Sequence, residues 1–198
     1  MKILITGFEP FDKETVNPSW EAVKRLPDVI GGCEVIKLRI PVVRFEALDA
    51  IAEKIRESHP DIVLSVGQAG GRTAVTPERI GINCDDYRIP DNAGNQPANE
   101  KIDPEGPDGW FSSLPVTDMC EAIRRAGVPS SLSNSAGTFV CNHVLYGVRN
   151  LCEKEFPEIR SGFIHVPYIP EQCLDKNAPS LALDDIVRAL QAAVEVCI

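Results

Sequence analysis

The sequence predicts an α/β sandwich with a largely parallel sheet, and three observations support this fold class. Short apolar runs alternate along the chain with longer segments in which apolar residues recur at helical spacing. No internal repeat and no interdomain linker interrupts this alternation. Of the 198 residues, 43% are hydrophobic, which suits a single domain over 1–198 with a full-sized core.

Strands are expected where apolar runs are short. The clearest run lies at 61–66 and precedes a glycine-rich turn, whereas 33–41 alternates between apolar and polar residues. The four main strands predicted in this way cover 2–6, 33–41, 61–66 and 160–166. We also expect an extended conformation over 77–85 and a short strand over 129–133.

Helices are expected where apolar residues recur every three to four positions after a capping signal. Asn17 is a suitable cap with Pro18 at the first helical position, and Ser180 is the expected cap of the last helix. The five predicted helices cover 17–26, 45–57, 115–126, 140–156 and 180–196. Residues 87–107 are rich in Pro, Gly, Asn and Asp, which predicts a long ordered loop.

The charge balance argues against nucleic acid as a partner. The chain has 20 Lys and Arg against 29 Asp and Glu, a net charge of −9, and no basic run. A nucleic-acid-binding protein needs a basic surface to displace counterions from phosphates. No apolar run approaches the roughly 18 residues of a membrane span, and the first residues predict a strand rather than a signal peptide.

The seven cysteines are an odd number and include no C-x-x-C pair. Cys141 and His143 form a C-x-H without a matching second pair nearby. We therefore expect no metal site and no cofactor. The cysteines are interpreted as reduced thiols of a cytoplasmic protein, most of them small buried hydrophobes.

Cys141 is the strongest candidate for a nucleophile. The extended segment at 129–133 leads through small polar residues into the helix predicted at 140–156, so Cys141 would lie in its first turn. Free amide protons and the helix dipole there favour a thiolate and are suited to hold an oxyanion. The helical spacing of Cys141 with Leu145 and Val148 is equally compatible with an ordinary core position.

A cysteine hydrolase needs an imidazole as acid and base, and the chain has three histidines. His59 ends a predicted helix, where an exposed positive charge is favourable. His143 is two positions from Cys141, and residues two apart on a helix do not face each other, so we expect a structural role. His165 lies near the end of the strand at 160–166, where sites of α/β folds form, and a buried core histidine is an equally good interpretation there.

The carboxylate that would orient this imidazole is not determined by spacing alone. Four acidic residues are candidates: Glu78, Asp85, Asp86 and Asp91. Each is also compatible with an ordinary surface charge or a turn residue.

Five blocks distributed over essentially the whole chain form one combined pattern. They are TGFEPF at 6–11 with NPS at 17–19, GQAGGR at 67–72, PERI at 77–80 running to RIPDN at 88–92, SAGTFVCN at 135–142, and HVP at 165–167. Together they are highly specific, and the chain resembles the pyrrolidone-carboxylate peptidases, also called pyroglutamyl peptidases of type I.

This resemblance implies a triad of Glu78, Cys141 and His165, with Arg88 near the oxyanion. It implies cysteine exopeptidases that remove an N-terminal pyroglutamyl residue from small peptides through a thioester acyl-enzyme. The implied fold is a three-layer α/β/α sandwich of the phosphorylase/hydrolase-like type with a mixed, largely parallel sheet. Such proteins are cytoplasmic and often form homotetramers.

The resemblance also implies a pocket for the lactam ring, which carries one N–H and one C=O on a flat apolar ring. Aromatic walls with a few polar groups suit such a ligand. The implied residues are Phe8, Phe11 and Phe139 as walls and Gln68 as a polar anchor acting through its main chain. Each of the four is also compatible with an ordinary core or turn position.

Two other functions remain open at this level. GQAGGR at 67–72 follows a strand and is suited to hold an anion, as in a phosphate-binding module or a nucleoside phosphorylase, although it lacks the G-x-G-x-x-G and G-K-[ST] patterns. A non-catalytic binding relative is the other alternative, and it is disfavoured because every proposed catalytic residue is present.

Overall fold

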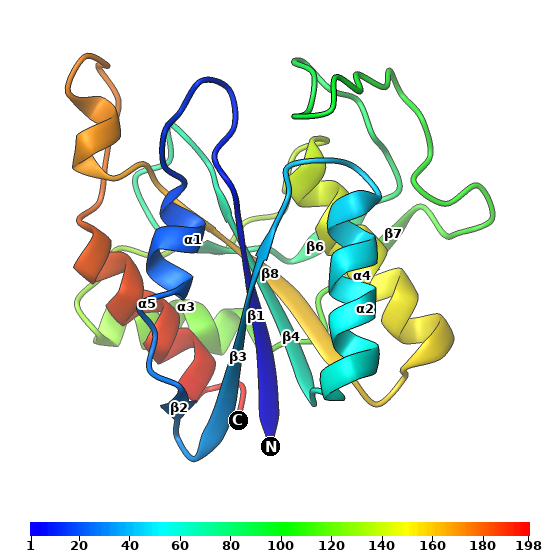
Figure 1. The fold of residues 1–198 in the computed structure, drawn as a ribbon. Helices are drawn as coiled ribbons and strands as arrows, with labels where there is room; N and C mark the ends of the chain where they lie inside the picture. Colours follow the sequence, from blue (N-terminus) through cyan, green and yellow to red (C-terminus); the bar gives the residue numbers. More distant parts are fainter.

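The structure, a computed structural model, describes residues 1–198, and it confirms the α/β sandwich with a mixed, largely parallel sheet (Figure 1). The strands of this sheet are β1 (Lys2–Phe8), β2 (Val29–Ile30), β3 (Cys33–Ile40), β4 (Ile62–Gln68), β5 (Thr76–Pro77) and β8 (Arg160–Val166). Their order is β2-β3-β1-β4-β8-β5. The four central strands are parallel, whereas β2 and β5 pair antiparallel at the two edges.

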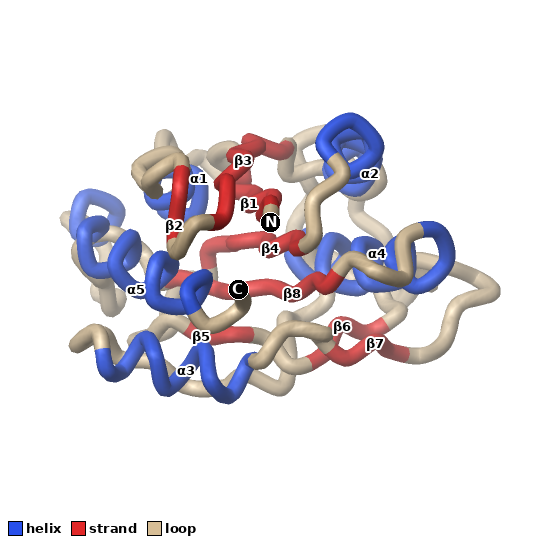
Figure 2. Tube along the Cα trace, turned by 90° about the horizontal axis from the view of Figure 1, so that it is seen from below, coloured by secondary structure: helices blue, strands red, loops and turns tan.

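Helices cover both faces of the sheet, as Figures 1 and 2 show from two directions. On one face lie α1 (Pro18–Val23), α3 (Val116–Arg125) and α5 (Leu183–Glu195). On the other face lie α2 (Glu46–Ser58) and α4 (Val140–Glu155). Because the sheet is covered twice, its central strands are buried on both sides, and this explains their nearly continuous apolar sequences.

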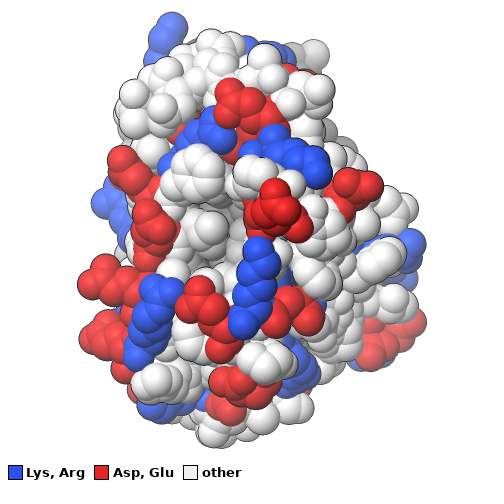
Figure 3. All heavy atoms as spheres, turned by 90° about the vertical axis from the view of Figure 1, so that its right-hand side faces the viewer, with Lys and Arg blue, Asp and Glu red and all other residues white.

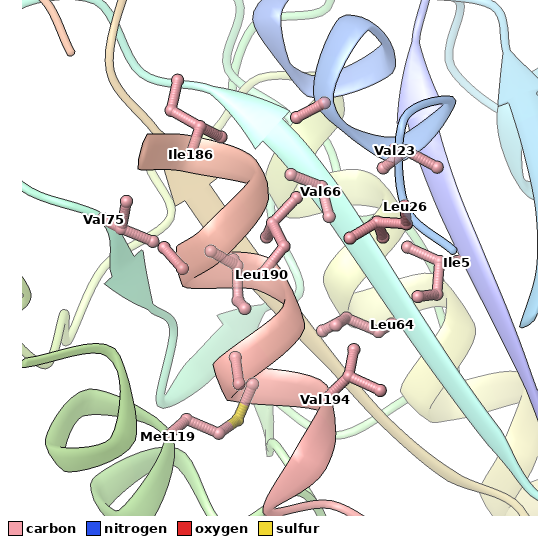
Figure 4. Packing of buried hydrophobic residues seen from close by; sticks show 14 of the residues in the cluster. Ile5, Val23, Leu26, Leu64, Val66, Val75, Met119, Ile186, Leu190 and Val194 are labelled. Carbon is pink, nitrogen blue, oxygen red and sulfur yellow. The ribbon is translucent and has the colours of Figure 1, made fainter. Parts of the chain in front are cut away.

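The core has two parts, one on each face of the sheet. Successive residues of β1 point alternately into them: Ile3 and Ile5 pack on the side of α1, α3 and α5, whereas Leu4 and Phe8 pack on the side of α2 and α4. Figure 4 shows the first part, in which Leu190 and Val194 of α5 lie beside β4, while Ile5 of β1 lies near Leu26. This packing holds the carboxyl ends of the strands in fixed positions relative to one another.

The first helix is shorter than predicted. Asn17 is its N-cap, as expected, and its side-chain oxygen accepts a hydrogen bond from the Ser19 N–H at 3.1 Å. The helix ends at Val23 rather than at 26, because the N–H groups of Arg25 and Leu26 bond to carbonyls three residues back, in a tighter turn. The bounds of α2, α3 and α4 differ from the predicted ones by one residue at most.

The prediction that Ser180 caps the last helix is wrong. Ser180 instead forms a parallel bridge with Tyr168, and the next N–H, that of Leu181, donates to the Tyr168 carbonyl. The helix begins only at Leu183, after Ala182. A short 3₁₀ helix that the sequence did not predict, η1 (Pro170–Cys173), precedes it.

Residues 129–133 do not form a regular strand. They run parallel to the β5 segment through isolated bridges on either side of it, Val75 with Ser130 and Glu78 with Ser133. The segment is extended, as expected, but too few of its backbone groups pair for a continuous ladder. The backbone hydrogen bonds of residues 129–133 still connect the segment that contains Glu78 to the loop that leads into α4.

The loop predicted at 87–107 is ordered, as expected. It connects β6 (Ile80–Ile82) and β7 (Gly109–Phe111), which form a separate two-stranded sheet beside α4. In this connection, the Asp85 N–H just before the loop donates to the Glu100 carbonyl at 2.7 Å, and the Tyr87 N–H donates to the Pro97 carbonyl at 2.9 Å. These bonds let a segment without helix or strand keep one conformation.

Acidic and basic side chains are interleaved on the face of the molecule that α2 and α4 cover (Figure 3). Cross-element ion pairs there include Arg56 with Glu155 at 2.9 Å and Lys154 with Asp103 at 2.5 Å. None of the helices combines the length and the apolar character needed to cross a bilayer.

Candidate active site

Cys141 lies in the first turn of α4, as predicted, one residue after the helix begins at Val140. It is partly exposed, in contrast to the four buried cysteines Cys33, Cys120, Cys152 and Cys197. Its side chain lines a cavity of about 490 Å³ at the carboxyl ends of β1, β4 and β8. The location agrees with the general rule for sites in parallel sheets.

Gly67 brings Cys141 and His165 to the same place. In the β4–β8 ladder Gly67 is the direct partner of His165. A Cβ atom on Gly67 would lie only 2.7 Å from the Cys141 sulfur. The thiol and the imidazole are therefore neighbours of one glycine, and both line the cavity.

Glu78 lies behind His165, away from the cavity. The chain holds it between β5 and β6 through its N–H, which donates to the Phe163 carbonyl at 2.9 Å. Its carboxylate oxygen Oε1 lies 2.7 Å from His165 Nδ1, and both side chains are buried. Because an ionised carboxylate only accepts hydrogen bonds, Nδ1 carries the proton and Nε2 is left as the basic nitrogen.

Arg72 belongs to the same cluster, although the sequence did not single it out as a site residue. Its guanidinium donates to Glu78 Oε1 at 2.6 Å, to the Ser135 carbonyl at 3.0 Å and to the Thr76 hydroxyl. The sequence feature that could have identified Arg72 is its position directly after a glycine-rich turn at the carboxyl end of a strand. Because Glu78 already pairs with it, the arginine does not offer the free cation that a phosphate-binding site would use.

The charges of this cluster set the protonation states. Burial alone would raise the pKa of Glu78, but the hydrogen bond and charge of His165 and the charge of Arg72 hold it below its ordinary value. Burial, together with the charge of Arg72, lowers the pKa of His165 below its ordinary value, although the bond and charge of Glu78 raise it. The resting pair is therefore a carboxylate bonded to a neutral imidazole at neutral pH.

The surroundings of Cys141 oppose the thiolate that its place at the start of a helix favours. Burial, and then the negative charge of Glu78, raise the pKa of the thiol to about 12. Burial disfavours the charged sulfur, whereas the helix dipole favours it. A thiol with a raised pKa needs a neighbouring base to become a nucleophile.

The cavity contains every residue that the resemblance assigned to the pocket. Its aromatic walls are formed by Phe8, Phe11 and Phe139, with the rings of Phe11 and Phe139 5.9 Å apart. Gln68 and Arg88 supply polar groups. The roles of these side chains stay predictions, but the structure brings all of them to one cavity together with Cys141 and His165.

The other candidate carboxylates have different partners. Asp85 is fully buried and bonds to His143 Nδ1 at 2.8 Å, with Arg44 Nε 3.3 Å away. Asp91 accepts hydrogen bonds from Asn95 and orders its loop. The Asp85–His143 pair supports the structural role expected for this histidine.

His59 is exposed at the C-cap of α2, as predicted. The structure groups no three His, Cys, Asp or Glu side chains that could hold a metal ion.

Comparison with known proteins identifies the family of this chain. A family model described as "Pyroglutamyl peptidase" matches residues 1–198. The pyrrolidone-carboxylate peptidase of Levilactobacillus brevis is 53% identical over 199 aligned residues, which cover 100% of this chain and 98% of that protein. Pyrrolidone-carboxylate peptidase 1 of Caldanaerobacter subterraneus is 50% identical with the same coverage.

Solved structures show the same fold. Pyroglutamyl peptidase I from Bacillus amyloliquefaciens superposes with a TM-score of 0.97 at 49% identity, covering 100% of this chain and 95% of that one. The pyrrolidone carboxyl peptidase from Thermococcus litoralis superposes with a TM-score of 0.95 at 37% identity, covering 99% and 92%. Because the match extends over the full chain in both sequence and structure, this protein belongs to the pyroglutamyl peptidase family.

Proposed function

We propose that this protein is a cysteine exopeptidase that removes an N-terminal pyroglutamyl residue from peptides through a thioester acyl-enzyme. The observation that carries the proposal is the hydrogen bond of 2.7 Å between Glu78 and His165 behind a cavity that Cys141 also lines. A nucleophile, a base and an orienting acceptor are the three parts of a covalent hydrolytic site. Membership of the pyroglutamyl peptidase family supports the substrate class.

In the first half of the reaction, His165 Nε2 takes the proton of the Cys141 thiol while the sulfur attacks the carbonyl carbon after the pyroglutamyl ring. Proton removal must accompany the attack, because the pKa of the resting thiol is raised to about 12. The tetrahedral intermediate collapses as the C–N bond breaks and the imidazolium gives its proton to the leaving amine. The products of this half are a free peptide and a thioester on Cys141.

In the second half, His165 takes a proton from water, whose oxygen attacks the thioester carbonyl. The C–S bond breaks, pyroglutamate leaves, and the proton returns from His165 to the sulfur of Cys141. In both halves the negative oxygen would be held by main-chain N–H groups at the start of α4. Arg88, which lines the cavity, would add a positive charge near this oxygen.

The cavity accounts for the choice of a lactam. The rings of Phe11 and Phe139 suit the flat apolar part of pyroglutamate, and Gln68 suits its polar edge. A volume of about 490 Å³ leaves room for the ring and the first atoms of the following residue. A site that bonds the ring carbonyl rejects proline, because the protein group would be left unpaired.

We further propose a single-domain cytoplasmic enzyme that acts as a homotetramer and needs no cofactor. All seven cysteines are free thiols, which fits a reducing compartment. Exposed apolar side chains outside the cavity, including Phe111 at 64% and Leu174 at 81% exposure, are available for contacts between subunits. Light scattering on the purified protein measures the number of subunits directly, and a monomer would contradict the tetramer.

Hydrolysis of a pyroglutamyl anilide tests the proposed function. We expect the wild-type protein to release the aniline from this substrate and to leave the prolyl anilide, which differs by one ring carbonyl, essentially intact. Iodoacetamide should inactivate the enzyme by alkylating Cys141, and 2-pyrrolidone, which mimics the ring, should slow the inactivation. Equal rates on the two anilides, or no rate on either, would contradict the proposal.

Substitution of Gly67 by alanine should disturb the nucleophile without removing it. The added Cβ would lie 2.7 Å from the Cys141 sulfur and 2.7 Å from the Phe163 ring, so one of them must move. Displacement of a reacting group by about 1 Å costs about 100-fold in rate, and we expect a loss of this size in kcat/KM. Gly109→Ala, which creates a milder crowding in β7 away from the cavity, with the nearest atom 3.1 Å from the added Cβ, should keep full activity. Wild-type activity in Gly67→Ala would show that the Cys141 sulfur can move away from residue 67 without loss of function.

A further inference from the structure

Gln172 of η1 connects the cavity to a loop outside it. Its Nε2 donates to Gln68 Oε1 at 2.9 Å and to Glu14 Oε2 at 3.1 Å, and its Oε1 accepts from the Ile169 N–H at 3.2 Å. Gln172 is 7% exposed and Gln68 is 9% exposed, so this chain of bonds is largely shielded from water. Gln68 lines the cavity, whereas Gln172 and Glu14 do not.

The orientation of both amides follows from the groups at the outer end of the chain. A main-chain N–H can only donate, so the oxygen of the Gln172 amide must face Ile169. An ionised carboxylate can only accept, so the NH₂ group of Gln172 must face Glu14. The second proton of that NH₂ then requires an acceptor, and the side-chain oxygen of Gln68 supplies it.

The consequence for the cavity is that Gln68 presents a donor. The oxygen of the Gln68 amide accepts a hydrogen bond from Gln172, so only the NH₂ group of that amide remains available for another partner. This Nε2 makes no hydrogen bond within the protein and is not enclosed by other atoms. Because Gln68 lines the cavity, this NH₂ is the group that its side chain can offer to a ligand there.

We propose that Gln172, oriented by Glu14, is a positioning residue for substrate choice, which holds Gln68 with its NH₂ toward the ring carbonyl of the substrate. The proposal rests on the proposed function and adds a side-chain donor from Gln68 to the main-chain contact implied by the resemblance. Without the outer groups the Gln68 amide could rotate and present its oxygen instead. An oxygen facing the lactam carbonyl repels it, so the direction of one amide decides whether the lactam edge is bound.

The double variant Glu14→Gln/Gln172→Glu tests the orientation with little change in shape and none in net charge. The carboxylate at 172 still accepts from the Ile169 N–H, and the amide at 14 donates to it. Because a carboxylate has no proton to give, Gln68 must turn its NH₂ toward position 172 and its oxygen toward the cavity. We expect KM for the pyroglutamyl anilide to rise about tenfold with kcat within twofold, since this contact is the same in ground and transition states.

A second measurement separates this effect from a general loss of structure. The inhibition constant of 2-pyrrolidone, which carries only the lactam, should rise by the same factor of about ten as KM. Alkylation of Cys141 by iodoacetamide without ligand should keep its wild-type rate. Lys176→Gln is the matched control: it breaks the Lys176–Glu14 ion pair, which the double variant also loses, and should leave both constants unchanged.

A folded double variant with wild-type KM and inhibition constant would overturn the assignment of Gln172. If the double variant shows no cooperative thermal unfolding, Gln172→Met decides, because it removes the bond to Gln68 at nearly constant length. We then expect at least a threefold rise in both constants, and unchanged values would again overturn the assignment. A wild-type protein inactive on the pyroglutamyl anilide would instead refute the proposed function itself.

Discussion

Replacement of Cys141 by alanine should lower kcat for a pyroglutamyl anilide by about 10⁴-fold or more, the range seen when the nucleophile of a covalent hydrolase is removed. No thioester can form without the sulfur, and the remaining site only orients the substrate. KM should change little, because the aromatic walls and Gln68 stay in place. The measurement is steady-state hydrolysis at enzyme concentrations high enough to detect the residual rate.

The control for Cys141→Ala is Cys173→Ala. Cys173 is also partly exposed but lies in η1 outside the cavity, so its loss should leave kcat within about twofold of wild type. Thermal unfolding of both variants shows whether either loses stability. If Cys141→Ala keeps more than a tenth of the wild-type rate, the thioester route is wrong.

The second large effect is expected for Glu78→Gln, with a fall in kcat of about 10³- to 10⁴-fold, as for the equivalent change in other triads. The glutamine NH₂ would donate to His165 Nδ1 and so favour the tautomer with the proton on Nε2, which is not a base. The change also leaves Arg72 without its buried carboxylate partner. Asp85→Asn is the matched control, because it alters the other buried carboxylate–histidine pair, and it should cost less than about tenfold.

The residual activity of Glu78→Gln should have a shifted pH profile. His165 must be neutral to take the thiol proton, so kcat/KM rises with pH through the pKa of His165. In the wild type, burial lowers this pKa and Glu78 raises it. Removal of the carboxylate therefore lowers the pKa further, and the acid limb of the profile should move to lower pH. A shift to higher pH, or full activity, would show that the acceptor lies elsewhere.

The periodicity of the sequence was sufficient for the main elements. The apolar runs at 2–6 and 61–66 correspond to β1 and β4, and the pattern at 140–156 corresponds to α4. These features are local, because a strand buried on both sides and an amphipathic helix each impose their own spacing. The position of Cys141 in the first turn of α4 followed from the same local signals.

Features that depend on contacts between distant segments could not be predicted in this way. Glu78 and Asp85 are seven positions apart, both are buried, and each bonds to a histidine. Only the fold shows that the histidine of Glu78 is the one in the cavity with Cys141. The family resemblance implied Glu78, whereas spacing along the chain left four carboxylates open.

The thiol of Cys141 shows most clearly what the sequence determined and what the tertiary structure determined. The sequence alone placed it at the start of a helix, because small polar residues before an apolar periodic segment define that junction. Its protonation was decided by the tertiary structure, because burial and the charge of Glu78 raise the pKa to about 12. The contacts of Arg72 and Gln172 were decided there as well. Desolvation and hydrogen bonding depend on which distant groups become neighbours, and the chain acquires those neighbours only when it folds.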